Sequence, residues 1–240
     1  MRALMIQHDH ICTPGFVGER FTERGYDLVL HQVVSEDDFQ SPNVKTQFPD
    51  PTDFDVIISM GAPWSVYDHE IIGSWVLPEL AMLRGAHVDH VPVFGICFGG
   101  QLLAAAHGGS VSRSAAPELG WVEIESDDES VVPAGEWFQW HYDRWELPEG
   151  ATELARNANS SQAFILGQNL AVQFHPEMSS AILASWIATG GAEDITKLGM
   201  NVEELVRQTA ERDVSNRERA HKLVDLFLDG VAAQSKVDRG

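Results

Sequence analysis

The stretch VFGICFGGQLLAAA, residues 93–106, joins a short apolar run, a cysteine flanked by glycines and the start of a helical segment. Gly95 lies two positions before Cys97, and Gly99 lies two positions after it. A strand that turns at once into a helix strains the turn residue and requires small neighbours two positions away. The spacing therefore predicts a nucleophile elbow, with the sulfur at the carboxyl end of a strand and at a helix N-terminus.

An elbow gives a cysteine two chemical advantages. The helix N-terminus lowers the pKa of a thiol, and the amide of the next residue, Phe98, points to where an oxyanion would form. The alternative is a small buried cysteine in a glycine-rich turn, a common role of free cysteine. A base near the sulfur would decide between these interpretations.

The segment LAVQFHPEM, residues 170–178, supplies a candidate base. Its apolar run ends at Phe174, so we expect His175 to emerge at the carboxyl end of a strand, at the same edge as Cys97. Glu177 is close enough to bind one imidazole nitrogen and leave the other facing the thiol, as in a Cys–His–Glu triad. The alternative is a histidine that caps the next helix, with Glu177 as an acid in its first turn.

The first half of the chain has the pattern of an α/β fold. Apolar runs at residues 3–6, 26–34, 54–60 and 91–96 alternate with helical segments at 14–24, 70–86 and 98–107. Strands buried on both faces are continuous apolar runs, so the pattern predicts an open, mostly parallel sheet with helices on both faces. We expect Pro78 to kink or split the second helical segment.

Beyond Gly108, short strand-like runs separated by turns predict an antiparallel extension, after which the chain returns to the main sheet at residues 170–174. The runs are SVSRS, WVEIES, WFQW, ELARN and AFILG. We expect a helix over 178–189, then two C-terminal helices from about residue 194 that pack on the body, with a frayed end. Their apolar positions are Leu198, Val202, Leu205, Val206, Leu223, Val224, Phe227 and Leu228.

Charge and composition limit the partners. The chain of 240 residues has 36 acidic and 16 basic residues and a formal net charge of -20, which disfavours nucleic acid and anionic membranes. It has no run of 18 apolar residues and no signal-peptide pattern. Two cysteines, Cys12 and Cys97, do not make a disulfide framework and suit a reducing compartment. We expect a soluble, cytoplasmic protein.

Taken together, GICFGGQ and the distant FHPE resemble the class I, triad-type glutamine amidotransferases. The likeness is greatest to free-standing members that resemble the amidotransferase domain of GMP synthase, and it covers most of residues 1 to about 185. It implies a flavodoxin-like fold, with residues 1–190 as the catalytic domain. Residues 191–240 are then a C-terminal helical extension packed on the same domain.

The resemblance also implies the roles of individual residues. Cys97 corresponds to the nucleophile, His175 to the general base and acid, and Glu177 to the residue that orients the imidazole. The segment SMGAPWSVYD, residues 59–68, resembles the loop whose amide, from Gly61 or Ala62, completes the oxyanion hole with that of Phe98.

The same resemblance points to residues that bind the substrate. Gln101 matches a residue that holds glutamine, and QWHYDRWELP, residues 139–148, resembles the segment around the α-amino and α-carboxylate groups. This segment implicates His141, Tyr142 and Asp143. The sequence departs from the family pattern at Ala62, where many members have glycine, and at Gly100, where many have histidine or another larger residue. Tyr142 also replaces a small residue and is expected to narrow or reshape the pocket.

The implied reaction is cleavage of the γ-glutamyl amide bond of glutamine, or of another γ-glutamyl compound, through a thioester on cysteine. It requires no metal and no organic cofactor, and the substrate is a small molecule. Three alternatives stay open: a subunit that delivers ammonia to a separate synthetase partner, a hydrolase without an acceptor, and a catalytically idle binding or regulatory protein. A related group of cysteine hydrolases and chaperones has the elbow cysteine but lacks the His-Pro-Glu strand.

Other polar residues have simpler interpretations. His8, Asp9 and His10 follow the first strand, where contact with the substrate is favoured over metal binding. Cys12 is most simply a thiol in a loop. The acidic segment at 125–130 has too few ligands at defined spacing for calcium and is expected to be a solvated turn.

Overall fold

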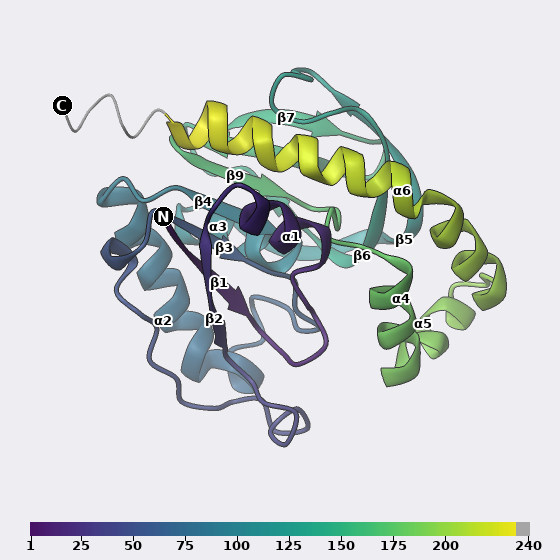
Figure 1. Ribbon diagram of the computed structural model, residues 1–240. Coiled ribbons are helices and arrows are strands. Elements are labelled where there is room, and N and C mark those ends of the chain that lie inside the picture. The colour runs from purple at the N-terminus through teal and green to yellow at the C-terminus, as the bar shows by residue number, and fades with distance from the viewer. Residues whose placement is uncertain (234–240) are drawn as a thin grey trace.

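The computed structural model describes residues 1–233, which contain one sheet of nine strands in the order β2-β1-β3-β4-β9-β8-β7-β5-β6 (Figure 1). The strands are β1 (Arg2–Gln7), β2 (Asp27–Gln32), β3 (Val56–Ser59), β4 (Val93–Ile96), β5 (Ser110–Ser126), β6 (Gly135–Glu146), β7 (Thr152–Arg156), β8 (Ser161–Leu166) and β9 (Asn169–Val172). The helices are α1 (Gly15–Glu23), α2 (His69–Val88), α3 (Phe98–Ala106), α4 (Ser180–Trp186), α5 (Ala192–Lys197) and α6 (Val202–Leu226).

The first five strands of this order pair in parallel, and the other four extend the sheet in antiparallel pairs. The predicted open sheet with an antiparallel extension is therefore confirmed. β9 pairs directly with β4, so strands distant in the sequence end side by side at the edge where the elbow lies.

Both faces of the parallel strands are covered, which explains their unbroken apolar runs. Along β1, Leu4 and Ile6 belong to a core with residues of α2 and α3. Ala3 and Met5 belong to a second core with residues of α1 and α6. Side chains of a strand alternate between faces, so each apolar run contributes to two cores at once.

The antiparallel part differs from the expected short runs in one respect. SVSRS and WVEIES are not separate strands, because both lie in the long strand β5. The register of β5 against β6 shifts between Arg113 and Glu118. Such an irregularity re-aims neighbouring side chains in a strand, and here it lies beside the edge that contains Cys97.

Helix α2 is continuous through Pro78, so the proline does not split it. Trp75 and Val76 before the proline and Leu80 and Leu83 after it are all buried against the sheet. Packing on both sides of the proline holds the two halves of the helix in line and offsets the hydrogen bond that proline cannot make.

The C-terminal region contains two helices, as expected, but of very different length. α5 has 6 residues and α6 has 25. The predicted helix over 178–189 begins as α4 at Ser180 and continues past Trp186 into a π-helical turn, Ile187–Gly191, where Thr189 and Gly190 leave the helical conformation. Leu198 and Val206, expected in the packed face, are exposed at 37% and 41%.

The middle of α6 is anchored by polar side chains instead, which explains why its apolar pattern is interrupted. Thr209 accepts a hydrogen bond from Nε1 of Trp121, and Nδ2 of Asn216 donates to the carbonyl of Met178. Both side chains are buried. Hydrogen bonding therefore places two polar residues in positions where periodicity predicts apolar ones.

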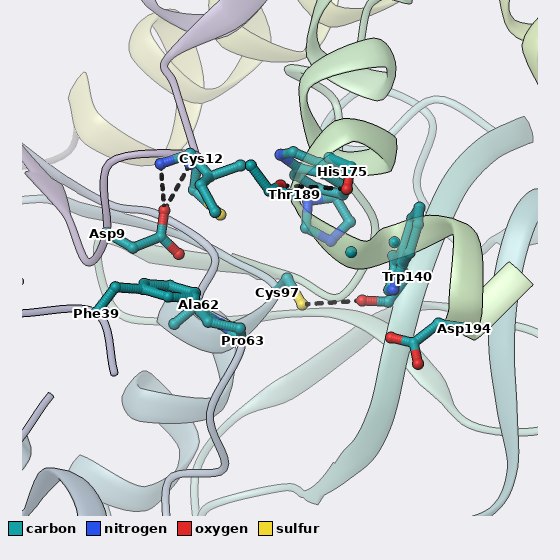
Figure 2. Close-up of a pocket in the computed structure, with 14 residues that line it drawn as sticks. Asp9, Cys12, Phe39, Ala62, Pro63, Cys97, Trp140, His175, Thr189 and Asp194 are labelled. Carbon is teal, nitrogen blue, oxygen red and sulfur yellow. Dashed lines mark hydrogen bonds between the residues drawn. The ribbon is translucent and has the colours of Figure 1, made fainter. Parts of the chain in front are cut away.

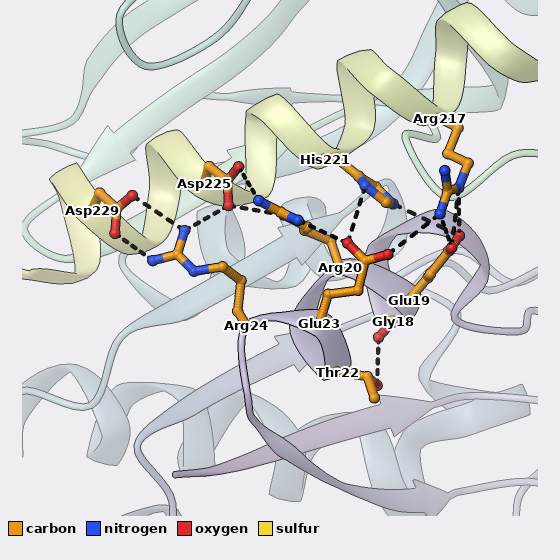
Figure 3. A network of polar contacts seen from close by, with 10 residues as sticks. All are labelled: Gly18, Glu19, Arg20, Thr22, Glu23, Arg24, Arg217, His221, Asp225 and Asp229. Atoms are coloured by element: carbon orange, nitrogen blue, oxygen red, sulfur yellow. Dashed lines mark hydrogen bonds and ion pairs between the residues drawn. The ribbon is translucent and has the colours of Figure 1, made fainter.

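Ion pairs join α6 to α1 along their length (Figure 3). Asp225 binds Arg20 and Arg24, and Arg217 binds Glu19. Ligand atoms of Glu19, Glu23 and His221 lie within 4.8 Å of one another, close enough in principle for a metal ion. The arginines Arg20 and Arg217 already pair with these carboxylates, so we interpret the cluster as part of the helix contact.

Among residues 1–233, no helix combines the length and apolar character that crossing a membrane requires. The expected frayed end falls on residues 234–240, which lie outside the described part of the chain.

Candidate active site at the elbow

The elbow has the geometry that its glycines predict. Cys97 lies between β4 and α3 with φ 50° and ψ -104°, in the left-handed region that side chains rarely adopt. A Cβ on Gly95 would lie 2.6 Å from the carbonyl oxygen of Gly99, and one on Gly99 would lie 2.0 Å from that of Ser59. Backbone contacts therefore exclude any side chain at either position.

Replacing Gly99 by alanine is expected to lower the free energy of unfolding by about 1–3 kcal/mol, because the new methyl group overlaps backbone that cannot move aside. Gly85 is the matched control, since it lies within α2 and a Cβ there meets nothing within 4 Å. Gly85→Ala should raise stability by about 0.5–1 kcal/mol. Urea unfolding of both variants measures the difference, and equal effects would contradict this account of the elbow.

The candidate base lies where the strand pattern predicts. Because β9 runs parallel to β4, His175 follows β9 at the same edge as Cys97. Its Nδ1 lies 2.7 Å from Oε1 of Glu177, and both side chains are at most 3% exposed. The other nitrogen, Nε2, is buried, and among the described residues its interaction is with the Cys97 side chain.

The charge on His175 follows from its neighbours. Burial alone lowers the pKa of this imidazole, but the negative charges of Glu177 and of a Cys97 thiolate outweigh burial and raise the pKa to about 10. This pKa favours the imidazolium form of His175, with Glu177 on one nitrogen and Cys97 on the other. This is the form that can donate a proton to a departing amine.

Cys12, the second cysteine, has different surroundings. It is buried in the loop after β1, where burial and the nearby Asp9 carboxylate raise its thiol pKa well above the usual value. Cys12 therefore stays protonated. This agrees with its interpretation as a loop thiol.

A buried polar network lies beneath the loop that follows β3. Nδ1 of His8 lies 3.1 Å from the carbonyl oxygen of Gly61, and its Nε2 lies 3.0 Å from Oε2 of Glu79. Ser59 donates to the same glutamate, 2.9 Å away. Burial lowers the pKa of His8, but Glu79 reverses the effect and the net shift is upward. A protonated ring donates from both nitrogens and fixes the carbonyl of Gly61.

The orientation of that carbonyl decides where the next amide points. The oxygen of Gly61 and the N–H of Ala62 belong to one planar peptide and point in opposite directions. Since His8 holds the oxygen on the buried side, the amide of Ala62 points away from His8. Ala62 lines the cavities that contain Cys97. A Cβ on Gly61 would lie 3.1 Å from Cε1 of His175, so the loop is also packed against the base.

Two cavities meet at Cys97. The larger, of about 320 Å³, is lined by Cys97, His175, Ala62 and residues from several other elements (Figure 2). The smaller, of about 150 Å³, is lined by the predicted oxyanion-hole residue Phe98 and by the four predicted substrate-binding residues, Gln101, His141, Tyr142 and Asp143. The structure thus brings all ten predicted site residues to one edge, with Glu177 behind His175 and Gly61 in the loop after β3.

Polar contacts hold the walls of the smaller cavity. Oδ1 of Asp143 accepts a hydrogen bond from the hydroxyl of Tyr67 at 2.9 Å, and its Oδ2 accepts one from Ser65. Nδ1 of His141 lies 2.9 Å from the carbonyl oxygen of Asp143, and its Nε2 lies 3.2 Å from a carboxylate oxygen of Glu118. His141 therefore forms part of the wall through these internal contacts.

Two residues of the site were missed by the sequence analysis. Arg113 pairs across the strands with Asp143, and its guanidinium lies 4.5 Å from the ring centre of Tyr142. Its position depends on the β5–β6 register, which has no sequence signal. Gln173 is buried and donates to Sγ of Cys97 at 3.5 Å. It lies two residues before His175, so the alternation of a strand could have indicated it.

The polar residues that follow β1 lie in different surroundings. Asp9 lines the larger cavity, whereas His8 is buried beneath the loop and the His10 ring packs 5.1 Å from that of Phe39. The expected contact with substrate is therefore possible for Asp9 and not for His8.

The model of one known protein family matches most of the chain. The model of the family described as glutamine amidotransferase class-I matches residues 19–187. The chain belongs to this family. The match confirms the resemblance carried by the elbow and the His-Pro-Glu segment, and it places both motifs of the amidotransferase inside the matched region.

The alignments of this chain with curated relatives cover only part of each protein. The chain is 38% identical over 129 residues to the glutamine-hydrolyzing GMP synthase of Aeropyrum pernix, an alignment that covers 48% of the chain and 25% of that relative. It is 35% identical over 142 residues to one of the subunits of the glutamine-hydrolyzing GMP synthase of Sulfurisphaera tokodaii, covering 52% and 69%. The chain thus spans about a quarter of the length of the first of these relatives.

A crystal structure of a glutamine amidotransferase from Thermotoga maritima has the same fold. The TM-score is 0.82 at 22% sequence identity, and the alignment covers 96% of the chain and 99% of that structure. The coverage includes the C-terminal helices of the amidotransferase, which the family model does not reach.

Proposed function

We propose that the protein cleaves γ-glutamyl amide bonds through a γ-glutamyl thioester on Cys97. One observation carries this proposal: the buried Glu177 carboxylate occupies Nδ1 of His175 and leaves the other imidazole nitrogen to the Cys97 side chain, in the cavity that both His175 and Cys97 line. A histidine that merely capped a helix would not need a buried carboxylate on one nitrogen and a thiol beside the other.

The reaction proceeds in two balanced steps. The Cys97 thiolate attacks the γ-carbonyl carbon, the C–N bond breaks, and the imidazolium of His175 gives its proton to the departing nitrogen. Neutral His175 then takes a proton from water as the water oxygen attacks the thioester, and the C–S bond breaks to release glutamate. Glu177 holds the ring in one orientation through both steps. The residues that take part need no metal or organic cofactor for this chemistry.

The oxyanion of each tetrahedral intermediate needs two amide donors. Phe98 is the first residue of α3, where an amide has no carbonyl partner within the helix. Ala62 supports the role of second donor better than Gly61, because the His8 contact turns the Ala62 amide away from the buried network. Removing one such donor costs on the order of 100-fold or more in rate.

Replacing His8 by alanine is expected to lower kcat by about 10- to 100-fold with a smaller effect on KM, because the Ala62 amide is then no longer held in position. His8→Asn is the informative partner, since an asparagine amide can donate to the Gly61 carbonyl from nearly the same place. Steady-state kinetics should show partial rescue of kcat by asparagine. Equal losses in both variants at matched thermal stability would show that His8 has only a structural role.

Two versions of this activity are possible, and the comparisons favour neither alone. The Sulfurisphaera tokodaii relative is one component of a synthase divided into subunits, which supports a chain that releases ammonia for a separate synthetase partner. A stand-alone hydrolase of γ-glutamyl compounds is the other version. The free thiols Cys12 and Cys97 suit a reducing compartment, which supports a cytoplasmic location for either version.

Release of glutamate by the purified protein tests the proposal. Glutamine and a set of γ-glutamyl amides are supplied without any partner, and the acid-quenched protein is examined by mass spectrometry for a γ-glutamyl adduct on the Cys97 peptide. Turnover with the adduct supports a hydrolase. An adduct on Cys97 without turnover supports a chain that depends on a partner, and neither adduct nor turnover supports an idle binding protein.

A further inference from the structure

The two cavities at Cys97 differ in which catalytic groups they contain. His175 lines the larger cavity and is absent from the walls of the smaller one. Arg113 and Asp143 line the smaller cavity and are absent from the larger. The sulfur of Cys97 lies where the two meet, so a substrate attacked by the sulfur extends into both.

If the proposed function holds, this difference shows which half of the substrate each cavity binds. The departing nitrogen takes its proton from His175, so the leaving group must occupy the larger cavity. The glutamyl half carries an ammonium and a carboxylate. The smaller cavity offers both complementary charges, with Arg113 for the carboxylate and Asp143 for the ammonium, and Asp194 lines both cavities.

The larger cavity is far bigger than ammonia requires. Its volume is about 320 Å³, whereas a small molecule such as water takes up about 30 Å³ in the liquid. Aromatic rings of Phe39, Trp140 and Trp186 contribute to its walls, and Trp186 also packs edge-on against His175 at 5.0 Å. Walls of this kind suit an apolar or aromatic group beyond the scissile nitrogen.

The charged residues of the larger cavity further limit the class of leaving group that it can bind. Among the described residues that line this cavity, the charged groups apart from His175 are the carboxylates Asp9 and Asp194. Asp9 is 1% exposed and is fixed by hydrogen bonds of 2.7 Å from the amides of Ile11 and Cys12, with its carboxylate toward the cavity (Figure 2). A leaving group with a carboxylate would be repelled by two like charges and would find no lysine or arginine in these walls.

We propose that the larger cavity binds the leaving group of a γ-glutamylated organic amine, one with an aromatic or apolar body and no carboxylate. The substrate class is then γ-glutamyl amides of arylalkylamines, in preference to glutamine and to γ-glutamyl amino acids. Glutamine places only an ammonia-sized group in the larger cavity, and a γ-glutamyl amino acid places its carboxylate near Asp9.

A matched pair of substrates tests this proposal. γ-Glutamyl-2-phenylethylamide and γ-glutamyl-L-phenylalanine differ only by the carboxylate on the leaving group, and glutamine has no organic leaving group at all. We expect kcat/KM for the phenylethylamide to exceed that for each of the other two by about 10-fold or more. Cleavage of glutamine or γ-glutamyl-phenylalanine with equal or higher kcat/KM would overturn the proposal and leave the general γ-glutamyl activity standing.

Two variants test whether the larger cavity causes the substrate preference. Phe39→Ala should lower the ratio of kcat/KM for the phenylethylamide to that for glutamine, because it removes a ring from the wall. Asp9→Asn keeps an oxygen for the loop amides and removes the charge, so it should narrow the gap between the phenylethylamide and γ-glutamyl-phenylalanine. Ratios that do not change in either variant would place the preference elsewhere and overturn the assignment.

Binding separates failure of this inference from failure of the proposed function. If the wild-type protein cleaves none of the three compounds, calorimetry with Cys97→Ala compares their affinities directly. Tighter binding of the phenylethylamide than of the phenylalanine derivative, reduced by Phe39→Ala, supports the cavity assignment in an inactive or partner-dependent protein. Equal affinity, or no binding of the phenylethylamide, overturns it.

Discussion

Cys97→Ala is expected to reduce glutamate release to background, a loss on the order of 10⁴-fold or more, because the proposed thioester cannot form without the sulfur. The variant should still fold, since alanine is smaller than cysteine and the backbone at this position is set by the strand–helix turn. Its thermal midpoint, compared with the wild type, separates loss of chemistry from loss of fold. The measurement is the rate of glutamate release from the best substrate found for the wild type.

The second cysteine provides an internal control for the same prediction. An electrophilic glutamine analogue should label wild-type protein on the peptide that contains Cys97. The Cys12 peptide should stay unlabelled, because burial raises the pKa of its thiol and keeps it protonated. Residual turnover in Cys97→Ala above that of a mock purification, or labelling mainly on Cys12, would refute the thiol mechanism proposed here.

Glu177→Gln is expected to lower kcat by about 10²- to 10⁴-fold, because an amide neither stabilises the imidazolium nor fixes its tautomer. The pH profile gives a more specific result. Burial lowers the pKa of His175, while Glu177 and the Cys97 thiolate raise it to about 10. The proton needed by the leaving group is therefore present below this pKa and lost as the pH rises through it.

Removing the Glu177 charge removes one cause that raises this pKa, so the alkaline limb of kcat/KM should move to lower pH in the variant. Glu153→Gln serves as the control, since Glu153 pairs with Arg156 on β7, away from the cavities. It should leave the profile unchanged. An alkaline limb that stays in place in Glu177→Gln would mean that the limb reports a group other than His175.

The sequence could indicate the elbow and the base because each depends on short-range spacing. Glycines stand two positions on either side of Cys97, where Gly95 contacts the backbone of Gly99 within the turn and Gly99 contacts the backbone of Ser59 on β3. His175 follows an apolar strand, so its place at the sheet edge follows from the direction of a parallel strand. The order of the strands then brings the two motifs together.

The sequence could not indicate features that depend on long-range packing. Arg113 faces Asp143 only because of the irregular register between β5 and β6. The larger cavity is closed by Phe39 in a loop and by residues around α4 and α5, whose approach to Cys97 no local pattern encodes. The packed face of α6 includes hydrogen-bonded polar residues such as Thr209 and Asn216, so a search for apolar periodicity does not detect this face.

The pairing of β4 with β9 also bears on how the protein folds. Ile96 pairs with Val172, so the contact between these strands closes a long loop that contains β5 to β8. We expect contacts of such large sequence separation to form late, because the entropy of closing the loop is lost before the pairing stabilises the chain. Until the last parallel strand docks, Cys97 lacks its base. The return of activity during refolding therefore reports this docking rather than the earlier collapse of the first three strands.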